Sequence, residues 1–283
     1  MFNTVTIIGM GLMGGSLGKA LLKYAPDIQV TGVVRRPEAI DEVLQAKAAH
    51  SCTMNLEEGV ADADLVVLSL PVLSICQFAS KIAPYLKKGC VVTDMGSTKK
   101  TIVQRVTKAL GADAVFIGSH PIAGSEKTGI SSASGDLFCD SLCIVTTDNS
   151  EQKENGKRVR KFWEVVGCRV SHMDSETHDY LLSAVSHVPH LISAVLMHFS
   201  ETISCRDLSA LDLAGSGFRD TTRLAAGSAG MWADICLTNK SNLMTHLRHV
   251  IEQMNSFLHI LDSEDKKGLI DYLEHARIMR EKL

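Results

Sequence analysis

The feature that most constrains this sequence is a glycine-rich turn near its start. A strand-like apolar run over 5–8 leads into Gly9, Gly11 and Gly14, and a helical pattern follows. Gly9 permits a tight turn, Gly11 lets the backbone approach a ligand, and Gly14 lets the helix pack on the strand. The helix start would direct free N–H groups and a positive dipole end at phosphates. We therefore expect a dinucleotide site whose residues here are Gly9, Gly11, Leu12, Met13 and Gly14.

Short apolar runs alternate with amphipathic stretches through residues 1–174. The strand-like runs cover 5–8, 30–34, 65–70, 91–93, 115–117, 142–146 and 168–172. The helical stretches include 16–24, 37–46, 73–86, 99–110 and 158–166. Apolar strands separated by helices indicate a parallel sheet that is covered on both faces. The pattern predicts an α/β fold with a Rossmann-type dinucleotide-binding domain over residues 1–174.

The pattern changes after Asp174, where helical periodicity takes over. Residues 175–283 contain no clear strand, so we expect an all-α second domain that binds substrate. The stretch 181–199 is apolar on nearly every side, as in a helix that is buried all round. A domain of about 110 residues rarely hides such a helix alone, so we expect a homodimer formed through the helical domain.

Charge and cysteine usage exclude several classes of protein. The 29 basic and 32 acidic residues give a net charge of -3, which predicts no nucleic-acid partner. The eight cysteines are scattered without paired spacing, so we expect reduced thiols and no metal site. No signal peptide precedes the first strand, and the apolar runs are shorter than the ~20 residues that span a bilayer. We expect a cytoplasmic protein with no membrane association.

The end of the second strand bears on the choice of cofactor. Val34 stands about 20 residues beyond the glycine turn, where NAD-binding sites usually carry an acidic residue for the ribose. Arg35 and Arg36 follow, and a guanidinium can clamp a 2′-phosphate. We expect NADP to be preferred over NAD. The alternative is that both arginines are solvated and only stack on adenine.

Two further turns are expected beside the cofactor. Ser69 and Pro71 end one strand, and Pro71 cannot continue a central ladder, so this turn belongs at the carboxyl edge of the sheet. Ser97 follows the next strand and could hydrogen-bond the substrate or the nicotinamide. Ser97 could equally cap the helix that starts near Lys99.

The segment around His120 is the most informative one for chemistry. His120 follows a strand at the edge where ligands bind in open α/β sheets, between Gly118 and Gly124. An imidazole near its ordinary pKa of about 6.5 can accept a proton at neutral pH. Catalysis and a plain surface histidine are both open on spacing alone.

The helical part holds two more candidate groups. His187 and His190 share a helix face, where they could contact substrate or be hydrogen-bonded core histidines, and Pro189 should kink this helix or begin its second half. Arg219 and Arg223 are four residues apart behind a glycine-rich bend, which suits an anionic substrate. A local salt bridge to the neighbouring Asp220 is the alternative for the arginines.

Three motifs taken together resemble the prephenate/arogenate dehydrogenase family of tyrosine biosynthesis. They are His-Pro-Ile-Ala-Gly at 120–124, Ser-His-Val-Pro-His at 186–190 and Gly-Phe-Arg-Asp-Thr-Thr-Arg at 217–223. The resemblance runs from the glycine turn to near residue 280. It implies oxidative decarboxylation of prephenate or arogenate, with hydride transfer to NAD or NADP. It also implies a helical, dimeric second domain, and the end of the chain leads us to expect no appended regulatory or mutase domain.

The resemblance also implies roles for individual residues. His120 would accept a hydrogen bond from the ring hydroxyl, and Ser97 would hold that hydroxyl and the nicotinamide. Arg223 would bind the ring carboxylate of a dicarboxylate substrate. The other residues that it places at the substrate are Arg219, His190, Ser125, Glu126, Ser186 and Trp232.

Two rival functions remain open at this stage. A 3-hydroxyacid-type dehydrogenase would use a catalytic lysine on a helix of the second domain, for which Lys240 is a candidate. An NADP-sensing regulator would keep the glycine turn and need neither His120 nor the arginine pair. Turnover of prephenate, arogenate and 3-hydroxyacids, compared side by side, would separate these functions.

Overall fold

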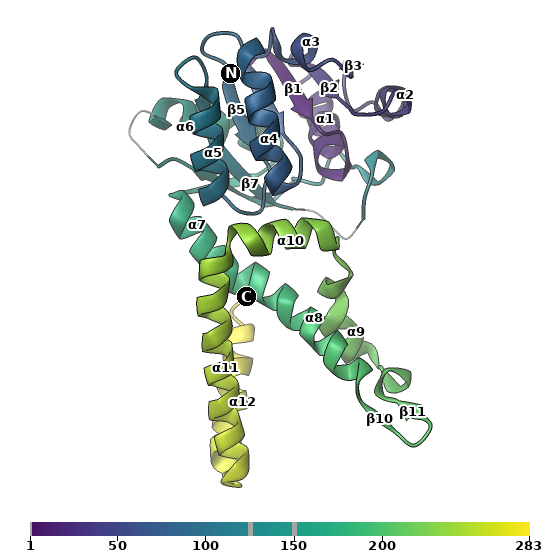
Figure 1. The fold of residues 1–283 in the computed structure, drawn as a ribbon, viewed down its shortest axis with the longest axis vertical. Helices are drawn as coiled ribbons and strands as arrows, with labels where there is room; N and C mark the ends of the chain where they lie inside the picture. Colours follow the sequence, from purple (N-terminus) through teal and green to yellow (C-terminus); the bar gives the residue numbers. More distant parts are fainter. Residues whose placement is uncertain (1, 124–126, 149–151) are drawn as a thin grey trace.

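The chain forms an α/β lobe followed by a mostly helical lobe, drawn at the top and bottom of Figure 1. The computed structural model describes residues 2–123, 127–148 and 152–283. The first lobe contains a parallel sheet of six strands in the order β3-β2-β1-β4-β5-β6. The strand order reverses between β1 and β4, which is the crevice where open α/β sheets bind their ligands.

The bounds of the elements around this sheet are as follows. Its strands are β1 Thr4–Ile8, β2 Gln29–Val33, β3 Ser51–Thr53, β4 Leu65–Leu68, β5 Val91–Asp94 and β6 Val115–Phe116. The helices between them are α1 Leu12–Tyr24, α2 Glu38–Gln45, α3 Leu56–Val60, α4 Val72–Ile82 and α5 Lys100–Leu110. The predicted Rossmann-type domain is confirmed. The short β3 and α3 were not expected.

Both faces of the sheet are apolar, because successive residues of its strands point to opposite faces and both sets are apolar. Ile7 and Val67 belong to one buried cluster, and their neighbours Ile8 and Leu68 belong to the other. The first cluster extends into α1 and the second into α4 and α5. This layering fixes the carboxyl ends of the strands and therefore the turns that follow them.

A second, three-stranded sheet completes the first lobe and corrects our expectation of a single sheet. It contains β7 Gly118–Ile122, β8 Leu142–Thr146 and β9 Arg169–Met173, with α6 Lys153–Val165 before β9. β7 runs antiparallel to β8, and β8 runs parallel to β9. His120 thus lies inside strand β7 and not in a loop after a parallel strand. Pro121 is tolerated there because it sits in an edge strand of this small sheet.

The second lobe is helical apart from one small hairpin. Its helices are α7 Ser175–Leu182, α8 Val188–Glu201, α9 Ser216–Thr222, α10 Ala229–Thr238, α11 Lys240–Asp262 and α12 Lys266–Arg280. The hairpin pairs β10 Ser204–Cys205 with β11 Leu208–Ser209. Figure 1 shows α8 and α11 diverging from the first lobe, with α12 running along α11. The domain boundary after residue 174 stays a prediction.

Helices α7 and α8 are joined without a break through a single π-helical turn over Ser183–His187. Pro189 lies in the first turn of α8, where it has no N–H to donate to a carbonyl of the preceding π turn. Pro189 therefore begins the second half of this helix, one of the two outcomes that we expected. The π turn sets the directions of the histidines on either side of it.

The combined helix 175–201 has a large exposed apolar surface. The exposed fraction is 74% for Val185 and 59% for both Val195 and Phe199. By length and composition alone, this helix could cross a membrane, so our statement that the apolar runs are too short does not hold for it. Apolar helices that pack against other parts of a protein can have the same length and composition.

Two aspartates of the second lobe cap helices of the first. The Asp179 carboxylate on α7 accepts hydrogen bonds from the backbone N–H groups of Lys99, at 2.6 Å, and Lys100, at 3.0 Å, at the start of α5. Asp234 on α10 accepts one from the N–H of Leu73, at 3.1 Å, in the first turn of α4. These caps satisfy N–H groups at the helix starts that have no partner within the helix. The two lobes are therefore joined by buried or partly buried hydrogen bonds.

Candidate active site

The glycine turn has the geometry that a pyrophosphate site needs. Gly9 has φ +96°, and a Cβ there would lie 2.3 Å from the Ser69 carbonyl oxygen. A Cβ on Gly14 would lie 2.0 Å from the Gly9 carbonyl oxygen, whereas a Cβ on Gly11 would meet no atom of the described residues within 4 Å. Gly11 is also the N-cap of α1 and provides no side-chain cap. The start of α1, with Leu12 and Met13, thus offers N–H groups beside open space.

Two other turns leave the sheet level with this one. Ile8, Leu68 and Asp94 are paired in register at the ends of β1, β4 and β5. Ser69 and the partly exposed Ser97 follow these ends within three residues, and Pro71 caps α4. The predicted positions of Ser69, Pro71 and Ser97 at the carboxyl edge agree with this register. Ser97 does not cap α5, because Asp179 does.

The pair after β2 lies at the surface. Val34 is half-buried, and Arg35 and Arg36 are exposed. The Arg36 guanidinium lies 3.7 Å from the Glu42 carboxylate on α2, and both side chains are about half exposed. An ion pair that is this exposed costs little to open, so it leaves the guanidinium able to meet a phosphate.

His120 is held against the end of β5 by its own neighbour. The backbone N–H of Ser119 donates to the Asp94 carboxylate at 3.0 Å, and the Ser119 hydroxyl donates to the Asp94 carbonyl at 2.6 Å. The fully buried Lys99 ammonium pairs with Asp94 and donates to the Ser119 carbonyl at 2.7 Å. This network fixes β7, and with it His120, beside the end of β5.

The His120 imidazole contacts a second buried imidazole from the helical lobe. His120 Nδ1 lies 2.9 Å from His178 Nε2, and His178 Nδ1 lies 2.8 Å from Asp179 Oδ1. Burial, followed by the positive groups nearby, holds the pKa of His120 well below its ordinary value. Burial also lowers the pKa of His178. Our expectation of an imidazole near its ordinary pKa is therefore wrong in magnitude, although a neutral His120 remains able to accept a proton.

A chain of contacts leads from this pair to the other histidines. Asn239 donates to the Asp179 carbonyl at 2.7 Å and lies 3.2 Å from His187 Nδ1. His187 is buried, and burial lowers its pKa to about 4, against the opposing effect of the nearby Ser97 backbone. In the part of the chain that the structure describes, His187 Nε2 has no hydrogen-bond partner. His187 is thus a core histidine with one ring nitrogen beside Ser97.

His190 and Trp232 form a stack next to His187. Their ring centroids are 3.4 Å apart with the planes 12° from parallel, and the His187 ring meets the same indole edge-on at 6.0 Å. A Cβ on Gly227 would lie 2.6 Å from the indole nitrogen and 2.9 Å from His190, so the stack requires a glycine there. The stack adjoins the 3₁₀ turn Arg223–Ala226, whose Ala225 N–H donates to Ser193 Oγ on α8.

The remaining described substrate candidates are more exposed than the buried histidines. Arg219 on α9 and Arg223 at the start of the 3₁₀ turn are exposed in the single chain, and Ser186 is half-buried in the π turn. Ser125 and Glu126 lie outside the described residues. His120, Ser97, His190 and Trp232 are connected through the contacts above, while the arginines lie on elements that pack on α8.

Sequence reasoning missed the residues that support His120. His178 and Asp179 precede the apolar stretch 181–199 and have no predicted role, and the same holds for Asp94, Lys99 and Asn239. The sequence did contain a signal, because a histidine and an aspartate stand next to each other just before the apolar stretch. If such polar side chains are buried with the helix, they need hydrogen-bond partners.

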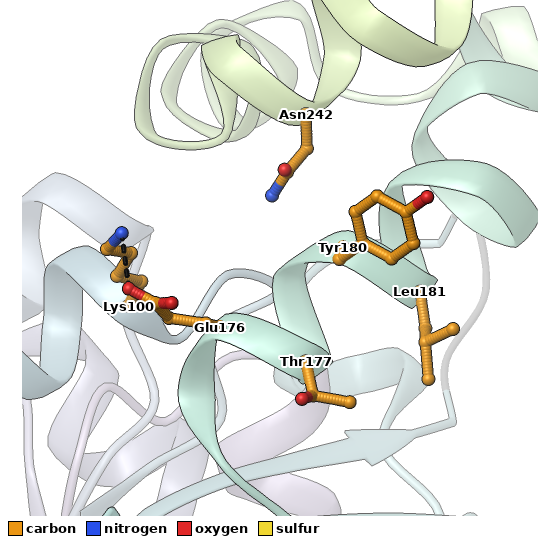
Figure 2. A pocket seen from close by; sticks show the side chains of 6 residues that line it. All are labelled: Lys100, Glu176, Thr177, Tyr180, Leu181 and Asn242. Atoms are coloured by element: carbon orange, nitrogen blue, oxygen red, sulfur yellow. Dashed lines mark ion pairs between the residues drawn. The ribbon is translucent and has the colours of Figure 1, made fainter.

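A separate surface hollow lies on the other side of α7. It is lined by Lys100, Glu176, Thr177, Tyr180, Leu181 and Asn242, and Figure 2 shows the Lys100–Glu176 ion pair at its edge, with an N–O distance of 2.6 Å. None of these is a predicted site residue, so the hollow is not the candidate active site. Within the described ranges, no group of three or more His, Cys, Asp or Glu side chains could hold a metal ion.

Comparison with known families identifies both lobes. A sequence model of the prephenate dehydrogenase nucleotide-binding domain matches residues 17–172, and one of the prephenate dehydrogenase dimerization domain matches residues 174–275. Together they span most of the chain and meet close to the start of α7.

Individual relatives agree over the full length. The cyclohexadienyl dehydrogenase of Zymomonas mobilis is 30% identical over 281 residues, 99% of this chain and 96% of that protein. The prephenate dehydrogenase of Bacillus subtilis is 29% identical over 286 residues, 100% of this chain and 76% of that protein. The crystal structure of prephenate dehydrogenase from A. aeolicus, in complex with hydroxyphenyl propionate and NAD+, has a TM-score of 0.94 and 32% identity, covering 100% of this chain and 98% of that one.

Proposed function

Because the chain belongs to the prephenate dehydrogenase family, we propose that it oxidises and decarboxylates prephenate or arogenate with His120 as the proton acceptor. It is a dehydrogenase of tyrosine biosynthesis. The observation that carries the role of His120 is its position: a buried imidazole on β7, next to Ser119, which is hydrogen-bonded to Asp94 at the end of β5, level with the ends of β1 and β4. The residues around His120 are assigned below to the cofactor and to the substrate.

The residues of the glycine turn fit a nicotinamide dinucleotide. The open space at Gly11 and the uncapped start of α1 would receive the pyrophosphate, and Ser69, Pro71 and Ser97 would line the path toward His120. When bound, the cofactor accepts the hydride from the ring carbon that bears the hydroxyl. The NAD+ in the A. aeolicus relative supports this use of the site.

His120 acts on the proton of the ring hydroxyl. As the hydride leaves the carbon, the hydroxyl proton passes to His120 Nε2, because His120 Nδ1 is engaged with His178. The ring carboxylate then departs as CO2, and the electron pair of the broken bond makes the ring aromatic. The ring oxygen takes the proton back from His120, so no net proton remains on the enzyme. Ser97 would hold the same hydroxyl.

The positive charges of the helical lobe anchor the anionic substrate. We assign the ring carboxylate to Arg223, with Arg219, His190, Trp232 and Ser186 around the rest of the molecule. Ser125 and Glu126, outside the described residues, keep their predicted place near the side-chain end. A protein of net charge -3 needs such focused arginines to bind a dicarboxylate. A charge-assisted hydrogen bond contributes about 1.5–3 kcal/mol.

The cofactor preference is assigned to the residues after β2. A half-buried valine at position 34 provides no carboxylate for the ribose, and the exposed Arg35 and Arg36 can reach a 2′-phosphate. We therefore propose NADP as the preferred cofactor, with NAD as the alternative. A higher kcat/KM with NAD than with NADP would refute this preference.

We also propose a cytoplasmic homodimer that forms through residues 175–283. The match of 174–275 to a dimerization domain supports it, as do the exposed Val195 and Phe199 on α8. A second copy would cover these side chains and would leave the helix 175–201 as an interface helix. Light scattering at micromolar concentration should give twice the chain mass of 30.7 kDa, and a monomer would contradict the dimer.

Steady-state kinetics on both substrates with both cofactors test the function most directly. Turnover of prephenate or arogenate, with no turnover of 3-hydroxyacids, is expected. Turnover of 3-hydroxyacids alone would favour the rival in which Lys240, exposed at the start of α11, is catalytic. Cofactor binding without any turnover would favour the regulator.

A further inference from the structure

The residue that takes the proton in the proposed reaction is the end of a line of three buried groups. His120 comes from β7 of the first lobe, and His178 and Asp179 come from α7 of the second. The two distances along the line are 2.9 Å and 2.8 Å, and His178 and Asp179 are almost completely buried. Polar groups that are buried in this way are hydrogen-bonded, so the donor and the acceptor of each bond can be derived.

The direction begins at Asp179. Its Oδ1 faces the backbone N–H of Lys99, and its Oδ2 faces that of Lys100. Both are donors at the start of the 11-residue helix α5, where a negative charge is stabilised. Asp179 is therefore an ionised acceptor with no proton to give. The third neighbour of this carboxylate, His178 Nδ1, must then be an N–H donor.

The direction continues to His120. His178 carries one proton when neutral, and that proton is on Nδ1, so its Nε2 is an acceptor. Burial lowers the pKa of His178, which agrees with the neutral form. His120 Nδ1 must then be the N–H that donates to His178. The lone pair of His120 is left on Nε2, the nitrogen directed away from His178.

We propose that His178 and Asp179 are positioning residues that hold His120 in the tautomer whose Nε2 can accept the proton of the substrate hydroxyl. This inference rests on the proposed function of His120. It adds a requirement that the sequence motifs do not contain: the second lobe must dock for the proton acceptor in the first lobe to be correctly protonated. When His120 takes the proton, the ionised Asp179 stabilises the imidazolium through His178.

Other charged groups face this line and bear on its pH dependence. The Lys99 ammonium lies close by on the β5–α5 connection, and Asp94 neutralises it. His187 faces the pair from the π turn. Lys99 opposes protonation of His120 and Asp179 favours it. Loss of the Asp179 charge should therefore move the acid limb of kcat to lower pH.

The first test reads the tautomers without using activity. In protein labelled with 15N-histidine, two-bond 1H–15N spectra at pH 7.5 should show His120 and His178 protonated on Nδ1, with His120 identified by its loss in His120→Asn. In Asp179→Asn, the side-chain amide can donate to His178 Nδ1, which would move both protons to Nε2. A His120 protonated on Nε2 in the wild type would overturn the inference. The dehydrogenase activity itself is tested separately, by turnover of prephenate or arogenate.

The second test is kinetic and separates positioning from folding. His178→Phe keeps an aromatic ring and removes the acceptor, so kcat should fall by roughly 10²–10⁴, the loss expected for a wrong tautomer, with KM changed less than about threefold. His178→Gln returns an acceptor to His120 and should recover kcat to within about tenfold of the wild type. Equal kcat values for the Phe and Gln variants would overturn the inference.

A matched control comes from the same helical segment. Ser183 is buried and its hydroxyl lies 2.9 Å from His246 Nδ1, so Ser183→Ala also removes a buried contact with a histidine. It should leave kcat and the tautomers of His120 and His178 unchanged. A loss of kcat in Ser183→Ala as large as in His178→Phe would mean that any damage to this helix suffices, and would overturn the inference.

Discussion

At the scale of single residues, the site is built by burial. His120 is only 8% exposed, and the groups that contact it are as buried or more so. A buried imidazole resists charging, which keeps it neutral and able to accept a proton over the whole neutral range. Arg219 and Arg223, which we propose to bind the anionic substrate, are exposed, so they carry their charge without the desolvation cost that burial imposes.

Replacing His120 with asparagine should remove the proton acceptor with little other damage. The amide can still donate to His178, so the packing around it is retained. We expect kcat to fall by roughly 10²–10⁴, the usual contribution of a positioned acid or base. Steady-state kinetics with a thermal unfolding curve will check this. Turnover near the wild-type value would remove His120 from the reaction.

The pH profile should show where His120 titrates. As the pH falls, protonated His120 can no longer accept a proton, so kcat should decrease on the acid side. Because burial lowers its pKa, the decrease should begin below pH 6.5, the approximate value of an unperturbed histidine. Measuring kcat from pH 9 to pH 4.5 at saturating substrate will locate the limb. A midpoint at or above about 7 would contradict the buried, neutral histidine.

Arg223→Ala should act on binding. Loss of one charge-assisted bond of about 1.5–3 kcal/mol corresponds to roughly a tenfold to hundredfold increase in KM. Arg169→Ala, an exposed arginine on β9 away from the helical lobe, should leave KM unchanged. If the two variants gave the same KM, Arg223 would not hold the substrate.

At the scale of elements, the glycine turn offers a matched pair of substitutions. Gly11→Ala adds a methyl group with no atom of a described residue within 4 Å, so thermal stability should hold while KM for the cofactor rises at least about tenfold. Gly14→Ala drives a methyl group into the Gly9 carbonyl, so the melting temperature should fall. Differential scanning calorimetry and cofactor kinetics distinguish the two. An unchanged KM in Gly11→Ala would mean that no pyrophosphate lies there.

Elements with a strong local pattern could be predicted, and those decided by tertiary contacts could not. The predicted strands at 5–8 and 91–93 contain only β-branched residues, and the structure has strands there. β7 contains glycine, serine, histidine and proline, which no strand pattern would include, and it is held by Asp94 and by pairing with β8. In the same way, the spacing of the glycines predicted the glycine turn. The contact of His120 with His178 could not be predicted, because it depends on how the two lobes pack together.

At the scale of the whole molecule, buried histidines make the folded state sensitive to acid. The pKa of His187 is lowered to about 4, and the pKa values of His120 and His178 are lowered as well. The unfolded chain binds protons at these positions near pH 6.5, so stability is complete above that value and is lost as the pH falls toward 4.

Urea unfolding at pH 7.5 and pH 5.0, at one fixed protein concentration, measures this loss. His187 alone should reduce the unfolding free energy by about 2 kcal/mol over that interval. His187→Gln should reduce the difference between the two pH values, and replacement of the exposed His198 should not. Equal stability at both pH values would show that these imidazoles take up protons while folded.

The two aspartate caps carry a consequence for modularity. Cutting the chain after residue 174 would strip α4 and α5 of the carboxylates that close their first turns, at a cost of about 1 kcal/mol each. The same cut would remove Ile235 and Trp232 of α10 from the apolar cluster to which Leu70 and Phe78 also belong. A nucleotide-binding domain that is moved to another protein would therefore need replacement caps and a replacement apolar cover. Combining the two halves of different relatives should succeed only when residues 179 and 234 can still cap the starts of α5 and α4.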